Sequence, residues 1–243
     1  MTENIKIEQT PVYISKPSGD VKGGLILIHE VWGMNDHIRD VAERYSKEGY
    51  LVYAPDLVSD TGIEELITVQ LQQDLFNPEK RNQVQPKLRE LMAPIQSPDF
   101  AKKTVASLKK IFEQLYNESV TNQKVAVIGF CFGGTYSYNL AVVEPRLQAA
   151  IPYYGHCDQP AEKLRSIQAP ILSFYGQNDV ALVSSLPDLE NRMHNAEVDF
   201  SYKVYPDCGH AFFNDSNPYA YNENAAKDSW IQSIEFLAKN LSR

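Results

Sequence analysis

Short apolar runs recur along the chain, separated by segments in which apolar residues repeat with a helical period. Runs of strand length occupy residues 23–30, 50–57, 124–130, 147–155, 169–176 and 198–206. Apolar residues gather instead on one face of a helix in the segments 37–49, 97–117 and 222–241. Strands that alternate with helices favour parallel pairing through helical crossovers, so the pattern predicts an α/β fold with a doubly wound, mostly parallel sheet.

Residues 58–97 depart from this regular alternation. Acidic and glutamine-rich helical pieces are interrupted there by Pro78, Pro86 and Pro94. No repeat, low-complexity tract or linker divides the chain. We therefore expect residues 1–243 to form a single domain, in which residues 58–97 are a helical excursion over the mouth of a site.

Composition narrows the classes of function. The formal net charge is −8, which argues against a nucleic-acid partner, because such proteins present a basic face. The first residues lack the cationic and then apolar pattern of a signal peptide, and no apolar run approaches the roughly 18 residues of a membrane span. We expect no membrane association. Nothing in the sequence defines the oligomeric state.

The cysteines point to a reducing compartment. Cys131, Cys157 and Cys208 are an odd, sparse set without the spacing of metal ligands. A disulfide framework is therefore not expected, and we predict a cytoplasmic protein without a metal site or cofactor. Cysteine is usually buried as a small apolar residue, and we interpret Cys157 and Cys208 in that way.

Polar residues with catalytic potential follow three of the predicted strands. Cys131 comes after "VAVIGF", Asp179 after "ILSFYGQN", and His210 after "YKVYPDCG". Ligands gather at the carboxyl ends of strands in open α/β sheets. The chain order of nucleophile, acid and histidine is that of α/β-hydrolases. Asp207 and Asp215 are alternative acids if Asp179 serves only as a turn or cap residue.

The glycines around Cys131 favour a strained strand–turn–helix junction. Side chains beside the apex of such a nucleophile elbow would clash with the strand and the helix, and Gly129, Gly133 and Gly134 avoid this. The same turn directs the amide of Phe132, at a helix N-terminus, toward a bound carbonyl. The positive potential of that helix end favours a thiolate and an oxyanion.

The motif "GFCFGG", together with "ALVSSLPDLE" after Asp179 and "CGHAFFND" around His210, resembles the dienelactone hydrolase (carboxymethylenebutenolidase) family. The similarity extends to "LIHEVWGMNDHIRDVAERYSKEGYLVYAPDL" and "AIPYYG", and so spans nearly the whole chain. The resemblance implies that Glu30 contacts the resting thiol and accepts its proton, and that the amides of Val31 and Phe132 form an oxyanion hole. It also implies cleavage of a small-molecule lactone or ester through an acyl-enzyme on Cys131.

Substrate recognition departs from the family pattern. Members that act on dienelactone hold the substrate carboxylate with two arginines, and Arg81 is the best match for the first. The second would follow the catalytic histidine by four residues, where this chain has Asn214, which we also assign to the substrate-binding residues. Tyr154 and His156, which follow "AIPY", are further candidates for the pocket lining. The sequence therefore predicts the catalytic residues more firmly than a dienelactone pocket.

Two other classes of protein share features of this sequence. A class I glutamine amidotransferase also has a Gly-x-Cys-x-Gly elbow, but it needs a His-x-Glu pair, and here Ala211 and Phe212 follow His210. The second alternative is a non-catalytic binding or redox-sensing relative with the same fold and a reactive thiol, and the sequence does not exclude it. We interpret the remaining histidines as structural or surface residues, namely His29, His37 and His194.

Overall fold

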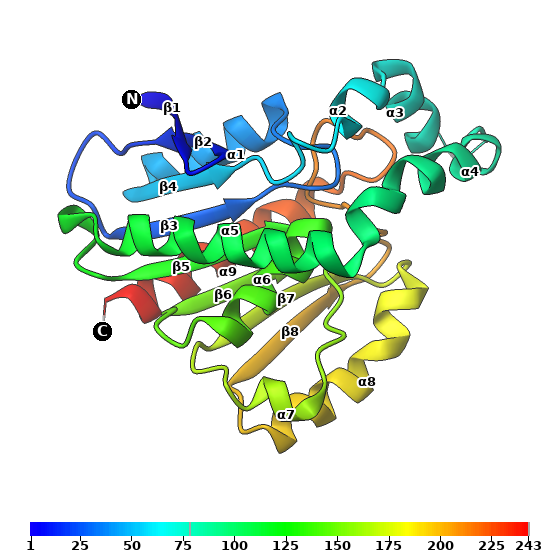
Figure 1. Ribbon diagram of the computed structural model, residues 1–243. Helices are drawn as coiled ribbons and strands as arrows, with labels where there is room; N and C mark the ends of the chain where they lie inside the picture. Colours follow the sequence, from blue (N-terminus) through cyan, green and yellow to red (C-terminus); the bar gives the residue numbers. More distant parts are fainter. Residues whose placement is uncertain (78, 243) are drawn as a thin grey trace.

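The computed structural model describes residues 1–77 and 79–242, so Pro78 lies outside the described residues. It contains an eight-stranded sheet with the order β1-β2-β4-β3-β5-β6-β7-β8 (Figure 1). The strands are β1 (Thr2–Ile7), β2 (Thr10–Ser15), β3 (Gly23–Ile28), β4 (Tyr50–Pro55), β5 (Val125–Phe130), β6 (Ala149–Tyr153), β7 (Ile171–Gly176) and β8 (Phe200–Tyr205). From β4 to β8 along this order every pair is parallel, which confirms the predicted mostly parallel α/β sheet.

The N-terminal hairpin is the part of the sheet that the apolar pattern did not predict. β1 pairs antiparallel with β2, and β2 pairs antiparallel with β4. β1 has the sequence TENIKI and is mostly exposed at the sheet edge, so it carries no continuous apolar run. The hairpin makes the sheet mixed.

Three adjacent strands in the middle of the sheet are fully buried. Every residue of β3, β4 and β5 is buried, as expected for strands covered by helices on both faces. β3 ends at Ile28, two residues before the end of the predicted run. His29 and Glu30 therefore lie just beyond the carboxyl end of a central strand.

Helices cover both faces of the sheet (Figure 1). They are α1 (Asp36–Lys47), α5 (Pro98–Tyr116), α6 (Phe132–Val143), α7 (Ala161–Leu164), α8 (Val180–Asn195) and α9 (Glu223–Leu241), with a short turn η2 (Ser119–Thr121). Figure 1 shows α5 in front of the sheet and α9 behind it. Tyr45 of α1 packs on Trp230 of α9 with ring centroids 4.3 Å apart, which places these two helices on the same face.

Side chains at the helix N-termini explain where several helices begin. Asn35 accepts a hydrogen bond from the amide of Ile38 at the start of α1. Ser97 does the same for the amide of Phe100, and Pro98 follows it as the first residue of α5. Such caps satisfy amides that have no partner inside the helix.

The segment 58–97 folds into short helices at one end of the sheet. These are α2 (Ile63–Leu66), α3 (Val69–Phe76), α4 (Arg81–Met92) and η1 (Ala93–Gln96). Pro86 lies inside α4 instead of ending it. The ring of Phe76 meets Trp32 edge-on at 5.7 Å, so this segment packs against the loop that follows β3.

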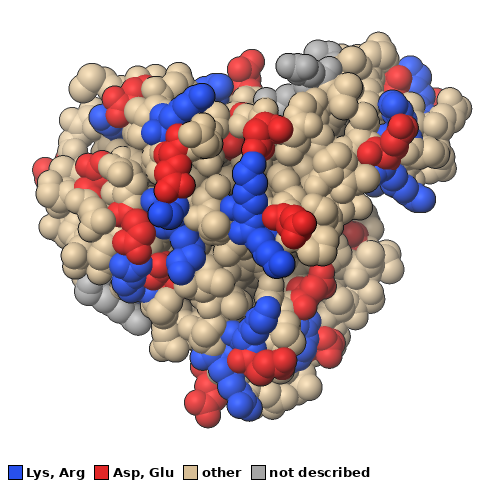
Figure 2. All heavy atoms as spheres, viewed as in Figure 1, with Lys and Arg blue, Asp and Glu red and all other residues tan. Residues whose placement is uncertain are grey.

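Charged residues of both signs share the visible surface. On the face drawn in Figure 2, lysines and arginines alternate with acidic side chains, and no broad basic patch covers that face. Among the described helices, none is both long enough and apolar enough to cross a membrane.

Candidate active site

Cys131 lies between β5 and α6 in a backbone conformation that residues other than glycine rarely adopt. Its φ is 55° and its ψ is −110°. Neighbouring glycines make this turn possible. A Cβ on Gly129 would lie 2.0 Å from the carbonyl oxygen of Gly133, and one on Gly133 would lie 2.2 Å from that of Ile28. The strained junction is the geometry of a nucleophile elbow.

The elbow is anchored on both sides of Cys131. The amide of Cys131 donates to the carbonyl of Tyr153 at 3.0 Å, and the amide of Gly133 donates to the carbonyl of His29 at 3.1 Å. The amide between them belongs to Phe132, the first residue of α6, which has no acceptor inside the helix. Among the described residues the Phe132 amide therefore has no acceptor, and it belongs to the residue that follows Cys131.

A buried histidine orients the second amide predicted for an oxyanion hole. His29 is fully buried; its Nε2 accepts from the amide of Leu57 at 2.9 Å, so the proton is on Nδ1. That Nδ1 lies 2.5 Å from the carbonyl oxygen of Glu30 and donates to it. Because the C=O and N–H of a trans peptide point in opposite directions, the amide of Val31 points away from His29.

His210 and Asp179 form a close pair past the ends of β8 and β7. Nδ1 of His210 lies 2.5 Å from Oδ2 of Asp179. Burial disfavours the charged ring, but the adjacent Cys131 sulfur and the Asp179 carboxylate outweigh it and raise the pKa of His210 to about 10. The alternative acid Asp215 pairs with other residues, His37 and Arg44.

Glu30 is a buried carboxylate that accepts hydrogen bonds from two side chains. Only 2% of the residue is exposed; Oε2 accepts from Nδ2 of Asn214 at 2.6 Å, and Oε1 accepts from the Tyr154 hydroxyl at 3.4 Å. Burial raises the pKa of the Glu30 carboxyl, and His37, then His210, offset part of that effect. Glu30 therefore holds a proton more readily than an exposed glutamate.

Tyr154 and Asn214 lie behind Glu30 and are fully buried. The sequence predicted both as substrate-binding residues. In the structure the polar groups of Asn214 are used by Glu30 and by Ser216, whose amide and hydroxyl donate to Oδ1 of Asn214. Neither side chain lines the cavity described next. Both support the carboxylate.

A cavity of about 710 Å³ opens above Cys131, Glu30 and His210. Besides the residues that follow β5, β7 and β8, its walls come from three segments that are distant in the sequence. The loop after β3 contributes Val31 and Trp32; the helical excursion contributes Leu75, Phe76, Arg81, Gln85 and Leu88; the turn before α9 contributes Asn217, Tyr219, Ala220, Tyr221 and Asn222. Arg81 is thus in the cavity wall, at the start of α4. Among the described residues, no cluster of His, Cys, Asp and Glu is arranged to hold a metal ion.

Sequence reasoning missed the wall formed by residues 217–222. This turn has no strand or helix period, and only its place a few residues after His210 could have suggested proximity to the site. Cys157 and Cys208 are free and buried, apart from the site cavity. Burial raises the pKa of the Cys157 thiol to about 11.

The sheet order and the elbow define an α/β-hydrolase fold. The structure of "Putative Dienelactone Hydrolase" from Klebsiella pneumoniae superposes with a TM-score of 0.82, at 23% identity over 98% of both chains. Brefeldin A esterase superposes with a TM-score of 0.70, at 12% identity over 100% of this chain and 77% of the other. These likenesses concern the fold.

The sequence itself places the chain in one family of that fold. Residues 10–241 match the Dienelactone hydrolase family. A protein of Saccharolobus solfataricus named "Putative carboxymethylenebutenolidase" is 32% identical over 90% of both chains. A Salmonella typhimurium protein of the same name is 28% identical over 96% of this chain and 83% of its own. The chain belongs to the dienelactone hydrolase family, as the sequence motifs predicted.

Proposed function

We propose that the protein hydrolyses a lactone or a small carboxylic ester through an acyl-enzyme on Cys131. The observation that carries the proposal is the convergence of Cys131, the His210–Asp179 pair and Glu30 on one cavity. Family membership and the names of the two relatives agree with this reaction class. The three free cysteines support a reducing, cytoplasmic setting.

Activation of the thiol uses Glu30. Burial lowers the pKa of His210, but the charged Cys131 sulfur and Asp179 raise it to about 10, so the imidazolium and the thiolate stabilise each other once the thiol has lost its proton. Glu30 and His210 are the two candidate acceptors of that proton, and we assign it to Glu30, whose pKa burial raises. Transfer of the Sγ proton to Glu30 leaves a thiolate beside the His210 imidazolium, which stabilises it.

Acylation then follows from the geometry of the elbow. The thiolate attacks the substrate carbonyl, and the amides of Val31 and Phe132 donate to the resulting oxyanion. Donors of this kind each lower the barrier by about 3 kcal/mol. Collapse breaks the ester C–O bond and forms a thioester, while His210 gives its proton to the departing oxygen. In a lactone that oxygen stays attached to the acyl group.

Deacylation reverses the proton movements. Neutral His210, oriented by Asp179, takes a proton from water as its oxygen attacks the thioester. Collapse of the second tetrahedral intermediate releases the acid and expels the Cys131 sulfur, which recovers its proton from Glu30. The starting protonation states of Cys131, His210 and Glu30 are thereby restored.

Arg81 is the proposed contact for an anionic substrate. It lies in the cavity wall, and Asn214 replaces the second arginine of the family pattern. In Arg81→Gln we expect a higher KM for a carboxylated lactone and an unchanged KM for a neutral ester. An equal effect on both substrates would refute the assignment.

Mass spectrometry of the intact protein during turnover tests the proposed function. A panel of short-chain aryl esters and lactones should add one acyl mass, located on the peptide that carries Cys131. Cys131→Ala should abolish both the adduct and the turnover, whereas Cys208→Ala, which removes a buried thiol, should retain them. Failure of the whole panel would favour the alternative of a non-catalytic, thiol-based binding or redox-sensing protein.

A further inference from the structure

Two asparagines in the cavity wall carry donors that the proposed reaction does not use. Oδ1 of Asn217 accepts a hydrogen bond from the amide of Tyr219 at 3.2 Å. Oδ1 of Asn222 accepts from the amide of Ala225 at 3.1 Å, at the start of α9. A backbone N–H donates only to the oxygen of a carboxamide, so these contacts define the orientation of both side chains. The Nδ2 group of each asparagine is left as a donor.

These Nδ2 groups are available to a molecule in the cavity. Asn217 is only 6% exposed, and both asparagines line the cavity. In the described part of the chain neither Nδ2 group has an acceptor, and neither is among the fully enclosed polar atoms that lack a partner. The open space beside the buried Asn217 is the cavity, so its Nδ2 group reaches that space.

The backbone of the turn 217–222 is itself held by hydrogen bonds. The amide of Tyr221 donates to the carbonyl of Asn217, and the amide of Asn222 donates to the carbonyl of Phe212, both at 2.9 Å. The two donors are therefore in place before a ligand binds. Donors that are already ordered lose little conformational entropy on binding.

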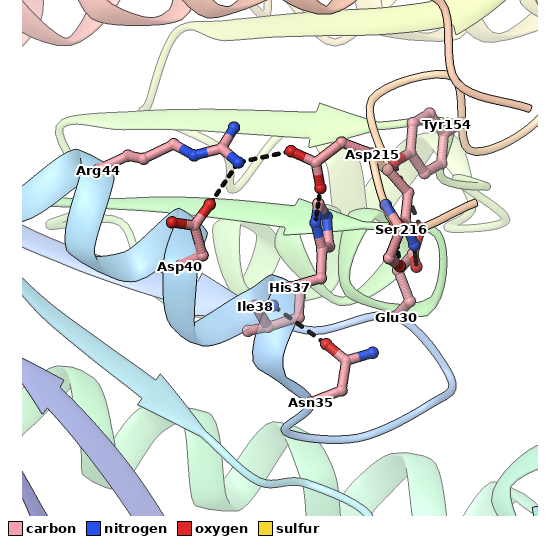
Figure 3. Close-up of polar contacts among 10 residues, drawn as sticks. Glu30, Asn35, His37, Ile38, Asp40, Arg44, Tyr154, Asp215 and Ser216 are labelled. Carbon is pink, nitrogen blue, oxygen red and sulfur yellow. Dashed lines mark hydrogen bonds and ion pairs between the residues drawn. The ribbon is translucent and has the colours of Figure 1, made fainter. Parts of the chain in front are cut away.

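The residues just before this turn are tied to distant parts of the chain. The amide of Asn217 donates to the carbonyl of Asn214, whose side chain donates to Glu30. Figure 3 shows the next side chain, Asp215, in contact with both Arg44 and His37. The turn thus starts from a fixed base beside the proposed catalytic carboxylate.

The donors of this wall carry no charge. Residues 217–222 have the sequence NPYAYN, which contains no acidic or basic side chain. Arg81 lies in a different part of the wall, at the start of α4. The turn therefore suits an oxygen that accepts a hydrogen bond, whether that oxygen is neutral or anionic.

We propose that Asn217 and Asn222 are specificity-determining residues that select a substrate with an acceptor oxygen, from a ketone or a carboxylate, in addition to its scissile ester. The inference rests on the proposed function and deepens it, because it names the kind of lactone or ester that the same cavity takes. The turn binds the oxygen whatever its charge, whereas Arg81 distinguishes an anion from a neutral group. An apolar substituent at this place would leave both donors unpaired.

Hydrolysis of γ-butyrolactones with an acetyl, a carboxylate or an isopropyl group on the γ-carbon tests the selection, because these substituents have similar size and shape. The variants are Asn217→Asp and Asn222→Asp, which keep the oxygen that accepts from the backbone and replace the donor by an acceptor. In the wild type we expect kcat/KM to be about tenfold higher for the acetyl lactone than for the isopropyl lactone. Each variant should lower this ratio by about threefold or more, and should lower kcat/KM further for the carboxylate lactone through like-charge repulsion.

Asn35→Asp is the matched control. Asn35 also accepts from a backbone amide at a helix start, that of Ile38, and it is not among the residues that line the cavity (Figure 3). This variant should keep the wild-type ratio. Partial loss of folded protein lowers the rates for all three lactones alike, so the ratio within each variant reports selection alone. Equal kcat/KM for the acetyl and isopropyl lactones in the wild type, or an unchanged ratio in both cavity variants, would overturn the proposal.

Binding of the intact lactones to Cys131→Ala, followed by NMR titration, separates this inference from the proposed function. Tighter binding of the acetyl lactone, lost when Asn217→Asp is added, would support the selection even if the wild type never forms an acyl-enzyme. The proposed function would then fail alone. Acyl-enzyme formation from both lactones, with no difference in their binding, would refute the selection and leave the proposed function standing.

Discussion

Asp179→Asn isolates the contribution of one carboxylate to the reactivity of Cys131. The substitution keeps the size of the side chain and removes its charge. In the wild type the Asp179 carboxylate lies 2.5 Å from Nδ1 of His210 and is largely shielded from solvent, with 15% of its side chain exposed. The asparagine should weaken the imidazolium that stabilises the thiolate.

The size of the effect follows from that contact. A hydrogen bond that involves a charged group contributes about 1.5–3 kcal/mol, and each 1.4 kcal/mol corresponds to a factor of ten. We therefore expect Cys131 in Asp179→Asn to react with iodoacetamide about 10- to 100-fold more slowly at neutral pH. The pKa of His210, raised to about 10 in the wild type, should fall, so the imidazolium should be lost at lower pH.

Alkylation measured across pH, with the adduct located by mass spectrometry, provides the assay. Asp207→Asn is the matched control, since Asp207 lines the same cavity and is one of the two alternative acids. It should alkylate at the wild-type rate. Equal alkylation profiles for Asp179→Asn and the wild type would refute the coupling of Asp179 to the thiolate. A loss seen only in Asp207→Asn would assign the acid to that residue.

Three further predictions concern the nucleophile, the elbow and the buried carboxylate. Cys131→Ser should reduce ester turnover by at least about 100-fold, because a serine hydroxyl does not ionise near neutral pH; wild-type turnover would exclude a thiolate mechanism. Gly133→Ala should cost about 3 kcal/mol or more in urea unfolding, since its Cβ would lie 2.2 Å from the Ile28 oxygen, while Gly19→Ala, with nothing within 4 Å, should change stability by less than about 0.5 kcal/mol. The raised pKa of Glu30 means that the folded protein favours the protonated carboxyl. The free energy of unfolding of the wild type should therefore fall as the pH rises above 4.5, the ordinary pKa of a glutamate. In Glu30→Gln, urea unfolding at a series of pH values should no longer show this fall.

The sheet was predictable because its central strands are buried on both faces. Apolar runs such as residues 125–130 stand out from the sequence without any knowledge of their neighbours. The hairpin β1–β2 could not be predicted, because its first strand is polar. That strand lies at the edge of the sheet, where it forms by pairing with a neighbour and not by burial. The helix containing Pro86 was also hidden, since proline normally ends a helix.

Some residues of the candidate site could also be predicted from the sequence, and others could not. Cys131, Asp179 and His210 each follow a strand, so chain order alone suggests that they meet. The role of Asn214 could not be predicted, because the sequence does not show that its side chain turns inward to Glu30, 184 residues earlier. His37 was interpreted as structural or surface, and its buried position depends on the same long-range packing.

The proposed reacting groups lie at strand ends, whereas most of the cavity wall lies in connecting segments. This separation affects how the fold can change its substrate. The proposed reacting groups follow β3, β5, β7 and β8, whose spacing the hydrogen-bonded ladder fixes. The cavity walls come largely from Leu75, Phe76, Arg81, Gln85 and Leu88 and from residues 217–222, which lie outside that ladder. Exchange of these two segments between relatives would transplant substrate preference while leaving the reaction itself in place. The chain is therefore a suitable scaffold for directed changes in ester and lactone selectivity.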